Sequence, residues 1–499
     1  MPMSVPSALY RSSLALLTDL YQLTMAYGYY RSGARDTESV FHLFYRRNPF
    51  KSGFAIACGL AQIVDLVEHF HFDESDIAYL ATLTGGDNQP LFDREFLGWL
   101  SRFRLSVDID AIPEGTVVFP HEPLVRVRGP IIDCQLLETA FLNMINFETL
   151  IATKAARIVH AAGGDPVLEF GLRRAQGIDG GLSASRAAYI GGCEATSNVL
   201  AGKLFGIPVK GTHAHSWVMS FGDELAAFEA YARAMPNNCV FLVDTYDTIE
   251  GVHHAVQVGK WLRENGGHLA GVRLDSGDLA QLSIEARRIL DEGGFPEAKV
   301  IASNDLDEHV IASLKQQGAQ IAVWGVGTRL VTAFDDPAMG GVYKLSAVRK
   351  TPSDPWQHRI KLSEQAIKVS TPGILQVRRF ESDHAFVGDA IFDESLPRET
   401  GSSSALTMVD LADVNRLRTF EASTHFEDLL VPIARGGKIV RASPPLIDVR
   451  ARAANQLQKL PATTRRFLNP QTYNVGLEAS LHELKTRLIR EARTHEKTP

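Results

Sequence analysis

Residues 271–304 read GVRLDSGDLAQLSIEARRILDEGGFPEAKVIASN, and this stretch holds the repeating unit that decides the fold. An apolar run at 272–274 leads into a polar turn with a glycine, then a helical segment, then a second apolar run at 300–302. Six such units predict a parallel β/α array, closed or nearly closed into an irregular, TIM-like barrel. The other four runs lie at 167–170, 209–210, 241–243 and 321–324.

Polar residues follow each of these runs at once. Because the strands of a parallel barrel all end at the same rim, the side chains that follow them are predicted to meet at one mouth. Groups far apart in the sequence would then share one site. They are Arg173, Thr212, His215, Asp244, Asp275, Ser303, Asn304, Gly327 and Thr328.

The segment GTHAHS at 211–216 ends in a histidine that is flanked by small or hydroxyl side chains. A lone histidine at a strand end is most often structural. Here the ring of His215 is expected to be accessible, and a neutral imidazole can attack a phosphoryl group to form a phosphohistidine. His213 and His215 also have the HxH spacing of some barrel metallohydrolases, which is the main competing interpretation.

Two further segments suggest phosphate and sugar binding. In RLDSGD the tight turn exposes successive N–H groups, and Asp275 can accept hydrogen bonds from ribose or hold Mg²⁺ through water; the alternative is an exposed cluster of ion pairs. In WGVGT, Gly325, Gly327 and Thr328 form a second glycine turn that is a candidate seat for a monophosphate. Phe170 is either a core residue or a platform for a flat heteroaromatic ring.

Composition excludes several functional classes. A formal net charge of −7 gives no basic field for a nucleic-acid backbone, so no nucleic-acid partner is expected. The four cysteines form no CxxC pair, which argues against a disulfide framework or a thiolate zinc site and fits a reducing cytosol. The apolar run near the N-terminus is cut by Asp19, so we expect a cytoplasmic protein without a membrane span.

Eight motifs, in this order, are similar to those of the nicotinate phosphoribosyltransferase family. The resemblance covers most of residues 14–373 and is weaker toward the C-terminus, where no functional residue is carried over. The motifs are LLTDLYQLTMAYGYY, EFGLRRAQGIDGGLSAS, GTHAHS, LVDTYDT, GVRLDSGDL, SNDLDE, GVGT and GGVYKL.

The resemblance implies a type II phosphoribosyltransferase of NAD salvage. Such an enzyme combines an irregular β/α barrel with an α+β, sandwich-like domain that is built from both ends of the chain, and it is usually a homodimer with shared active sites. We therefore expect residues 1–150, completed by 350–460, to form the second domain, residues 151–349 to form the barrel, and residues 461–499 to form a helical tail.

The implied reaction transfers phosphoribose from phosphoribosyl pyrophosphate to nicotinate, coupled to ATP hydrolysis. His215 resembles the histidine that ATP phosphorylates, and Mg²⁺ is expected to be held through the substrate's pyrophosphate and water, with no dedicated protein ligands. The remaining roles are also carried over by similarity. Tyr21 from the dimer partner and Phe170 would sandwich the pyridine ring, Thr212 and Arg273 would lie near the nicotinate carboxylate, Asp244 near the ribose and base, and Arg173, Asp275, Gly327 and Thr328 around phosphoribosyl pyrophosphate. We expect Asp244 and Asp275 to be catalytic together with His215, and Ser303, Asn304 and Gly325 to bind substrate.

Local charge distinguishes nicotinate from nicotinamide as the acceptor. The relative that uses nicotinamide has an acidic residue directly after the threonine of the GT segment, where this chain has His213. An acidic group would repel a carboxylate, so a pocket with Arg273 and without that acid favours nicotinate. Two alternatives stay open: the same transfer with nicotinamide, and a barrel that binds a nucleotide without turnover.

Overall fold

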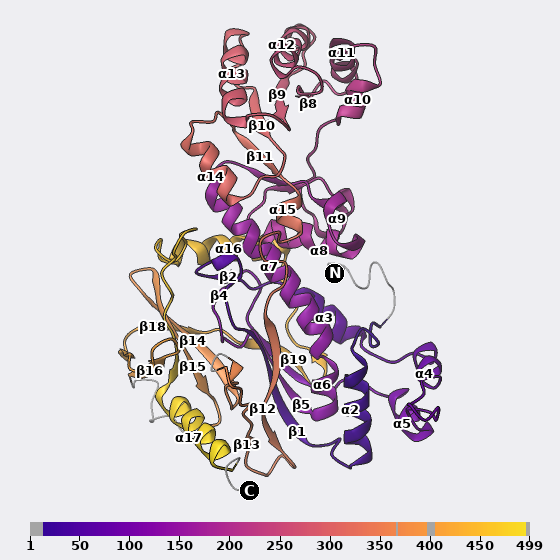
Figure 1. Ribbon diagram of the computed structural model, residues 1–499, viewed down its shortest axis with the longest axis vertical. Coiled ribbons are helices and arrows are strands. Elements are labelled where there is room, and N and C mark those ends of the chain that lie inside the picture. Colours follow the sequence, from indigo (N-terminus) through magenta and orange to yellow (C-terminus); the bar gives the residue numbers. More distant parts are fainter. Residues whose placement is uncertain (1–12, 366–367, 397–404, 496–499) are drawn as a thin grey trace. The chain divides into compact units, whose positions relative to one another are not determined.

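The computed structural model describes residues 13–365, 368–396 and 405–495. The chain divides into two compact units. Residues Met1–Leu150 and Ala338–Pro499 contribute to one, which we call the sheet unit. Residues Ile151–Pro337 form the other, which we call the barrel unit. Helix α7 (Glu138–Ala162) continues from the first sequence range into the second (Figure 1).

The barrel unit contains a curled sheet of six parallel strands in the order β7-β6-β11-β10-β9-β8. A single parallel bridge from Thr196 to Val209 extends the sheet at one edge, while no strand pairing among the described residues joins residue 209 to β8. This confirms the predicted irregular β/α barrel. Its sheet is open between residue 209 and β8, where no backbone hydrogen bonds of the described chain pair the two edges. The strands are β6 (Val167–Glu169), β7 (Ala195–Thr196), β8 (Cys239–Leu242), β9 (Leu269–Leu274), β10 (Lys299–Ala302) and β11 (Val323–Val326).

Apolar side chains fill the inside of this sheet, since Leu168, Val240, Ile301 and Val323 form one buried cluster. Aspartates begin several of the covering helices: Asp278, for example, accepts the backbone N–H groups of Ala280 and Gln281 at the start of α13. The helices are η2 (Leu172–Arg174), α8 (Gly177–Ile190), α9 (Val199–Phe205), α10 (His215–Met219), α11 (Glu224–Ala234), α12 (Thr248–Glu264), α13 (Leu279–Glu292), α14 (Glu308–Gln316) and α15 (Thr328–Val331).

The sheet unit is built on two larger sheets, visible in the lower part of Figure 1. A seven-stranded antiparallel sheet has the order β13-β12-β1-β5-β3-β19-β20. Its strands are β1 (Glu38–Tyr45), β3 (Asp108–Ala111), β5 (Val125–Pro130), β12 (Gly341–Arg349), β13 (Gln357–His358), β19 (Val431–Arg435) and β20 (Lys438–Ile439).

The second sheet of this unit has six strands in the order β17-β16-β21-β15-β14-β18, and only β15 and β21 pair in parallel among them. Its strands are β14 (Leu375–Ser382), β15 (Ala385–Asp393), β16 (Leu406–Asp410), β17 (Leu417–Phe420), β18 (His425–Asp428) and β21 (Val475–Glu478), and a small separate sheet pairs β2 (Ala55–Ile56) with β4 (Val117–Val118). The helices of the unit are α2 (Leu20–Arg31), η1 (Pro49–Lys51), α3 (Leu60–His69), α4 (Glu74–Leu80), α5 (Arg94–Leu100), α6 (Ile131–Leu136), α16 (Leu446–Lys459) and α17 (Ala479–His495).

Two expected domain limits differ from this arrangement. Residues 341–349, expected in the barrel, form β12, which pairs with β1 along its whole length. The segment 461–499, expected to be a helical tail, contains β21 within the six-stranded sheet before α17 begins. Both strands pair with segments distant in sequence, so local hydrophobic periodicity carried no signal for their partners.

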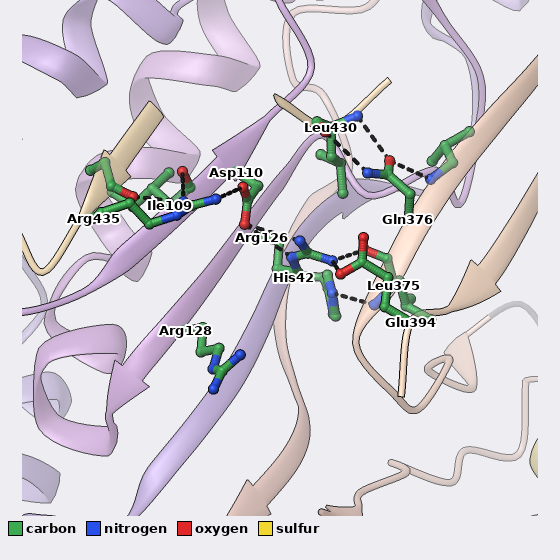
Figure 2. A network of polar contacts seen from close by, with 12 residues as sticks. His42, Ile109, Asp110, Arg126, Arg128, Leu375, Gln376, Glu394, Leu430 and Arg435 are labelled. Atoms are coloured by element: carbon green, nitrogen blue, oxygen red, sulfur yellow. Dashed lines mark hydrogen bonds and ion pairs between the residues drawn. The ribbon is translucent and has the colours of Figure 1, made fainter. Parts of the chain in front are cut away.

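A buried polar network ties the two larger sheets of the sheet unit together (Figure 2). Arg126 of β5 donates to Asp110 of β3 at 3.0 Å, to Glu394 at 2.9 Å and to the carbonyl of Leu375 at 3.0 Å. His42 of β1 accepts the N–H of Leu375 at 3.2 Å, and Figure 2 shows both side chains converging there. The side chain of Arg126 is only 9% exposed, so these hydrogen bonds and ion pairs, rather than water, stabilise its positive charge.

In the described parts of the chain, no helix is both long and apolar enough to cross a membrane.

Candidate active site at the mouth of the barrel

Residues that follow β8, β9 and β10 meet the GTHAHS segment through a chain of contacts within the barrel unit. His215 begins α10, and its side chain is 40% exposed. Its Nδ1 lies 3.1 Å from the hydroxyl of Thr245, just beyond β8. Its Nε2 lies 3.9 Å from Oδ2 of Asp275, just beyond β9. The ring is therefore held on one nitrogen and accessible on the other.

Arg273 brings a cation to the same place. It donates a hydrogen bond to the hydroxyl of Thr212, while its Nε is buried with no partner among the described residues. Burial lowers the pKa of Arg273, although Asp275 and Asp244 act in the opposite direction. An arginine with an unpaired buried donor is suited to a carboxylate or phosphate on a ligand.

The two aspartates are oriented by different groups. Oδ2 of Asp244 accepts the backbone N–H of Asp275 at 2.9 Å and the hydroxyl of Ser276 at 2.6 Å. Oδ1 of Asp244 is buried and has no partner in the described part of the chain. Oδ1 of Asp275 accepts the hydroxyl of Ser303. Oδ2 of Asp275 thus remains available to a sugar hydroxyl or to a hydrated cation, whereas Oδ1 of Asp244 is out of reach of either in this arrangement.

Phe170 lies against the glycines of WGVGT, but the predicted turn begins later than expected, because Gly325 is buried within β11 and only Gly327 follows the strand. A Cβ atom on Gly325 would come within 2.8 Å of the Phe170 ring, and a Cβ on Gly327 would come within 3.3 Å of the Phe170 carbonyl oxygen. The glycines therefore allow the close approach that fixes this half-buried ring at the end of β6. Thr328 is the first residue of α15, which has four residues, so an anion there would depend on local N–H and hydroxyl groups more than on a helix dipole.

Three other predicted residues have different surroundings. Arg173 is exposed in η2, and its positive charge contributes to lowering the pKa of Arg273. Asn304 follows Ser303 and is exposed with φ 101°, a backbone conformation that residues other than glycine rarely adopt. Tyr21 belongs to α2 in the sheet unit, where its side chain is 48% exposed. No described contact joins Tyr21 to the others.

Sequence reasoning missed two residues that shape this site. Thr245 holds the ring of His215, and the only hint was a hydroxyl next to Asp244 in LVDTYDT. Glu169 is buried at the end of β6, where it accepts the N–H of Gly171 and the hydroxyls of Ser185 at 2.8 Å and Thr196 at 2.5 Å. Glu169 thereby fixes the strand end that carries Phe170.

His213 points away from the mouth into the core. It is 8% exposed and lies against the rings of Phe228, Tyr231 and Phe241. Its Nε2 accepts the backbone N–H of Leu242 at 3.3 Å, and its Nδ1 lies 3.4 Å from the carbonyl of Ala214.

Because both nitrogens of His213 are engaged, it is not placed to bind a metal with His215, as the HxH interpretation required. Among the described residues, the one group of histidine, cysteine and acidic side chains with metal-like spacing is Cys58, Glu114 and Glu148, outside the barrel unit.

The chain matches three family models along most of its length. These are the nicotinate phosphoribosyltransferase N-terminal domain at residues 16–146, the nicotinate phosphoribosyltransferase family at 167–353 and its C-terminal domain at 376–485. The nicotinate phosphoribosyltransferase of Bacillus subtilis is 42% identical over 96% of this chain and 97% of its own. That of Caenorhabditis elegans is 36% identical over 94% and 92%.

A solved structure gives the same result. The crystal structure of human nicotinic acid phosphoribosyltransferase superposes with a TM-score of 0.82 at 33% identity, over 94% of this chain and 99% of that one. The resemblance in the motifs is thereby confirmed across the whole described fold, and the chain belongs to the nicotinate phosphoribosyltransferase family.

Proposed function

We propose that the protein transfers the phosphoribosyl group of phosphoribosyl pyrophosphate to nicotinate, forming nicotinate mononucleotide and releasing pyrophosphate. The ring nitrogen of nicotinate would form a bond to the anomeric carbon as the bond from that carbon to pyrophosphate breaks. Family membership supports the reaction class. The observation that carries the site assignment is the contact chain that joins His215, Asp275 and Ser303 at the barrel mouth.

Arg273 and Thr212 are suited to the carboxylate of nicotinate. The guanidinium is already hydrogen-bonded to the Thr212 hydroxyl, and its Nε has no protein partner among the described residues. A neutral amide would gain less from this cation than a carboxylate does, so the site favours nicotinate over nicotinamide. Phe170 would cover one face of the pyridine ring, and in a homodimer the partner subunit's Tyr21 would cover the other.

Asp275 is suited to the ribose and to Mg²⁺, and Asp244 fixes the backbone of Asp275 through a hydrogen bond from its N–H. Each carboxylate has one oxygen fixed by protein donors and another oxygen without a short protein hydrogen bond. Oδ2 of Asp275 fits a Mg²⁺ ion that keeps most of its water and is bound mainly by the pyrophosphate, whose negative charge it would neutralise. Arg173, Asn304 and the turn of Gly327 and Thr328 after β11 would complete the phosphate contacts.

His215 would accept a phosphoryl group from ATP. In this step Nε2 bonds to the γ-phosphorus while the bond from that phosphorus to the bridging oxygen breaks and ADP leaves. The Thr245 hydroxyl fixes Nδ1, so the lone pair of Nε2 has a defined direction into the mouth. The phosphohistidine would later be hydrolysed, which couples ATP use to the transfer in a cytoplasmic enzyme.

One incubation tests the reaction. Purified protein is given radiolabelled nicotinate, phosphoribosyl pyrophosphate and Mg²⁺, with and without ATP, and the products are separated. We expect nicotinate mononucleotide in both cases and more of it with ATP. Conversion of nicotinamide with nicotinate left unused would contradict the assigned acceptor, and loss of activity only on removal of tightly bound zinc would favour the hydrolase alternative.

His215→Ala tests the ATP step separately. The variant is expected to keep part of the transfer activity and to lose both acid-labile phosphorylation by γ-labelled ATP and stimulation by ATP. Phosphorylation that persists at the wild-type level in His215→Ala would remove His215 from this role.

A further inference from the structure

The sheet unit contains a cavity of about 530 Å³ that takes no part in the site described above. It lies where the chain after β4, the end of β16, the approach to β21 and helix α17 come together. Apolar groups such as Phe119, Leu411 and Val475 line it together with His121 and Lys485. This volume is in the range that small-molecule sites occupy.

Lys485 supplies the cavity with a positive charge that no described carboxylate neutralises. Its Nζ donates to the hydroxyl of Thr371 at 3.1 Å, and none of the ion pairs of the described chain includes it. Burial lowers the pKa of the Lys485 ammonium to about 8. Two of its three N–H donors are therefore left for another partner, and an anion there would restore the solvation that burial removed.

Tyr473, which lines the cavity, contacts a buried group of charged side chains that are not part of the lining. Tyr473 donates to Asp389 at 3.0 Å, and Arg379 forms a buried ion pair with the same carboxylate. Burial and the neighbouring Asp389 raise the pKa of Glu122 well above its ordinary value, and Oε2 of Glu122 accepts the backbone N–H of Phe119 at 2.8 Å. Arg379 and Asp389 balance one another. The charged side chains in the lining itself are Lys485 and Asp410, and of these only Lys485 has N–H donors to offer a ligand.

Two further residues affect the polarity of the cavity. Asp410 lines it with a carboxylate whose Oδ1 accepts the backbone N–H groups of Ala412 and Asp413 at 2.7 and 3.2 Å, so an anionic ligand group is expected on the Lys485 side. His121 has φ 72°, a conformation rarely adopted by residues other than glycine, and strain of this kind concentrates at ligand sites. Burial and the nearby charges of Lys485 and Arg46 lower the pKa of His121 to about 4, so it is neutral at pH 7.

We propose that this cavity is a second ligand site, which binds a small organic acid whose anionic group pairs with Lys485 and whose apolar or aromatic body lies against Phe119, Leu411 and Val475. The proposal is independent of the reaction at the barrel mouth, because every residue that lines the cavity lies in the sheet unit.

The test uses the full-length protein and 2-naphthoate as probe, with binding measured by isothermal titration. Lys485 lies outside the barrel unit, so the part of the signal that depends on Lys485 reports the cavity. We expect wild-type protein to bind one equivalent that Lys485→Met binds at least tenfold more weakly, and the uncharged 2-naphthamide to bind weakly to both.

Arg487→Met is the matched control, since it removes one positive charge from an exposed position of the same helix and should leave binding unchanged. Ala412→Trp fills the cavity without altering Lys485 and should abolish binding, which keeps the test valid if Lys485→Met folds poorly. Equal binding by Lys485→Met and wild type, or equal binding of the amide and the acid, would each overturn the proposal.

Discussion

The imidazole of His213 bridges the gap in the parallel sheet of the barrel unit by accepting the backbone N–H of Leu242 at its Nε2, at 3.3 Å. Leu242 ends β8, the edge strand of that sheet, and residue 209 marks the other edge. A side chain thus takes the place that a strand carbonyl would occupy in a closed barrel, and it anchors the segment that carries Thr212 and His215.

We expect His213→Phe to destabilise the protein by about 1–3 kcal/mol, because the N–H of Leu242 would be buried without an acceptor while the ring volume is kept. Urea denaturation measures the change. His253→Phe, at an exposed position of α12, is the control and should stay within about 0.5 kcal/mol of wild type. An unchanged midpoint in His213→Phe would show that the bridge contributes nothing.

Stability should fall as the pH is lowered below about 6.5. Burial lowers the pKa of His42 to about 3 and that of His213 to about 4. Between these values and the ordinary histidine pKa, the unfolded chain binds more protons than the folded protein, so the free energy of unfolding decreases as pH falls through this window. Each such histidine contributes a slope of about 1.4 kcal/mol per pH unit.

Denaturation of wild type and His213→Phe at pH 7.5 and pH 5 isolates one of these contributions. The variant should lose less stability than wild type over the interval, by on the order of 1–2 kcal/mol. Parallel losses in the two proteins would mean that the His213 ring is protonated equally in the folded and unfolded states.

Thr245→Val should slow phosphorylation of His215 by about five- to tenfold, since it removes a hydrogen bond worth about 1 kcal/mol that fixes Nδ1. The initial rate of acid-labile labelling from γ-labelled ATP is the measurement. Thr248→Val, at the start of α12, tests for an effect of losing any nearby threonine hydroxyl. A normal rate in Thr245→Val would mean that the ring is oriented by other contacts.

Arg273→Ala should raise the KM for nicotinate by about 10- to 100-fold, as expected for loss of a charged hydrogen bond of about 1.5–3 kcal/mol. The KM for phosphoribosyl pyrophosphate should change less. Arg233→Ala, an exposed arginine of α11 paired with Glu229, is the matched control. If nicotinate affinity were unaffected and only pyrophosphate release changed, Arg273 would belong to the phosphate side of the site.

Arg126→Met should cost about 3 kcal/mol or more of stability, because it leaves the buried carboxylate of Asp110 with a weaker set of partners. Arg128→Met on the same strand removes an ion pair at a side chain that is 38% exposed and should cost less than about 1 kcal/mol. Thermal and urea unfolding of both variants provide the comparison. Similar costs for the two would mean that the network of Figure 2 is no stronger than a surface ion pair.

Much of the barrel was predictable because its signals are local. Each repeating unit, such as those that begin with β9 and β10, consists of a short apolar run, a polar turn and a helix. All of these features lie within a few dozen consecutive residues. The two-residue strand β7 was missed since it is too short to show a period, and the run at 209–210 forms only a single bridge. Because all strands of a parallel barrel end at the same rim, the residues that follow them could be predicted to lie close together.

The sequence by itself determined the repeating unit of the barrel, the chemical types at its mouth and the family to which the chain belongs, because these depend on neighbouring residues and their order. Only the tertiary structure decided that the His213 ring turns inward while His215 stays accessible, that residues 341–349 pair with β1, and that Lys485 lies beside a cavity without an ion pair to any described carboxylate. These features depend on packing between segments far apart in the chain, and side-chain direction and burial are set by that packing rather than by local propensity.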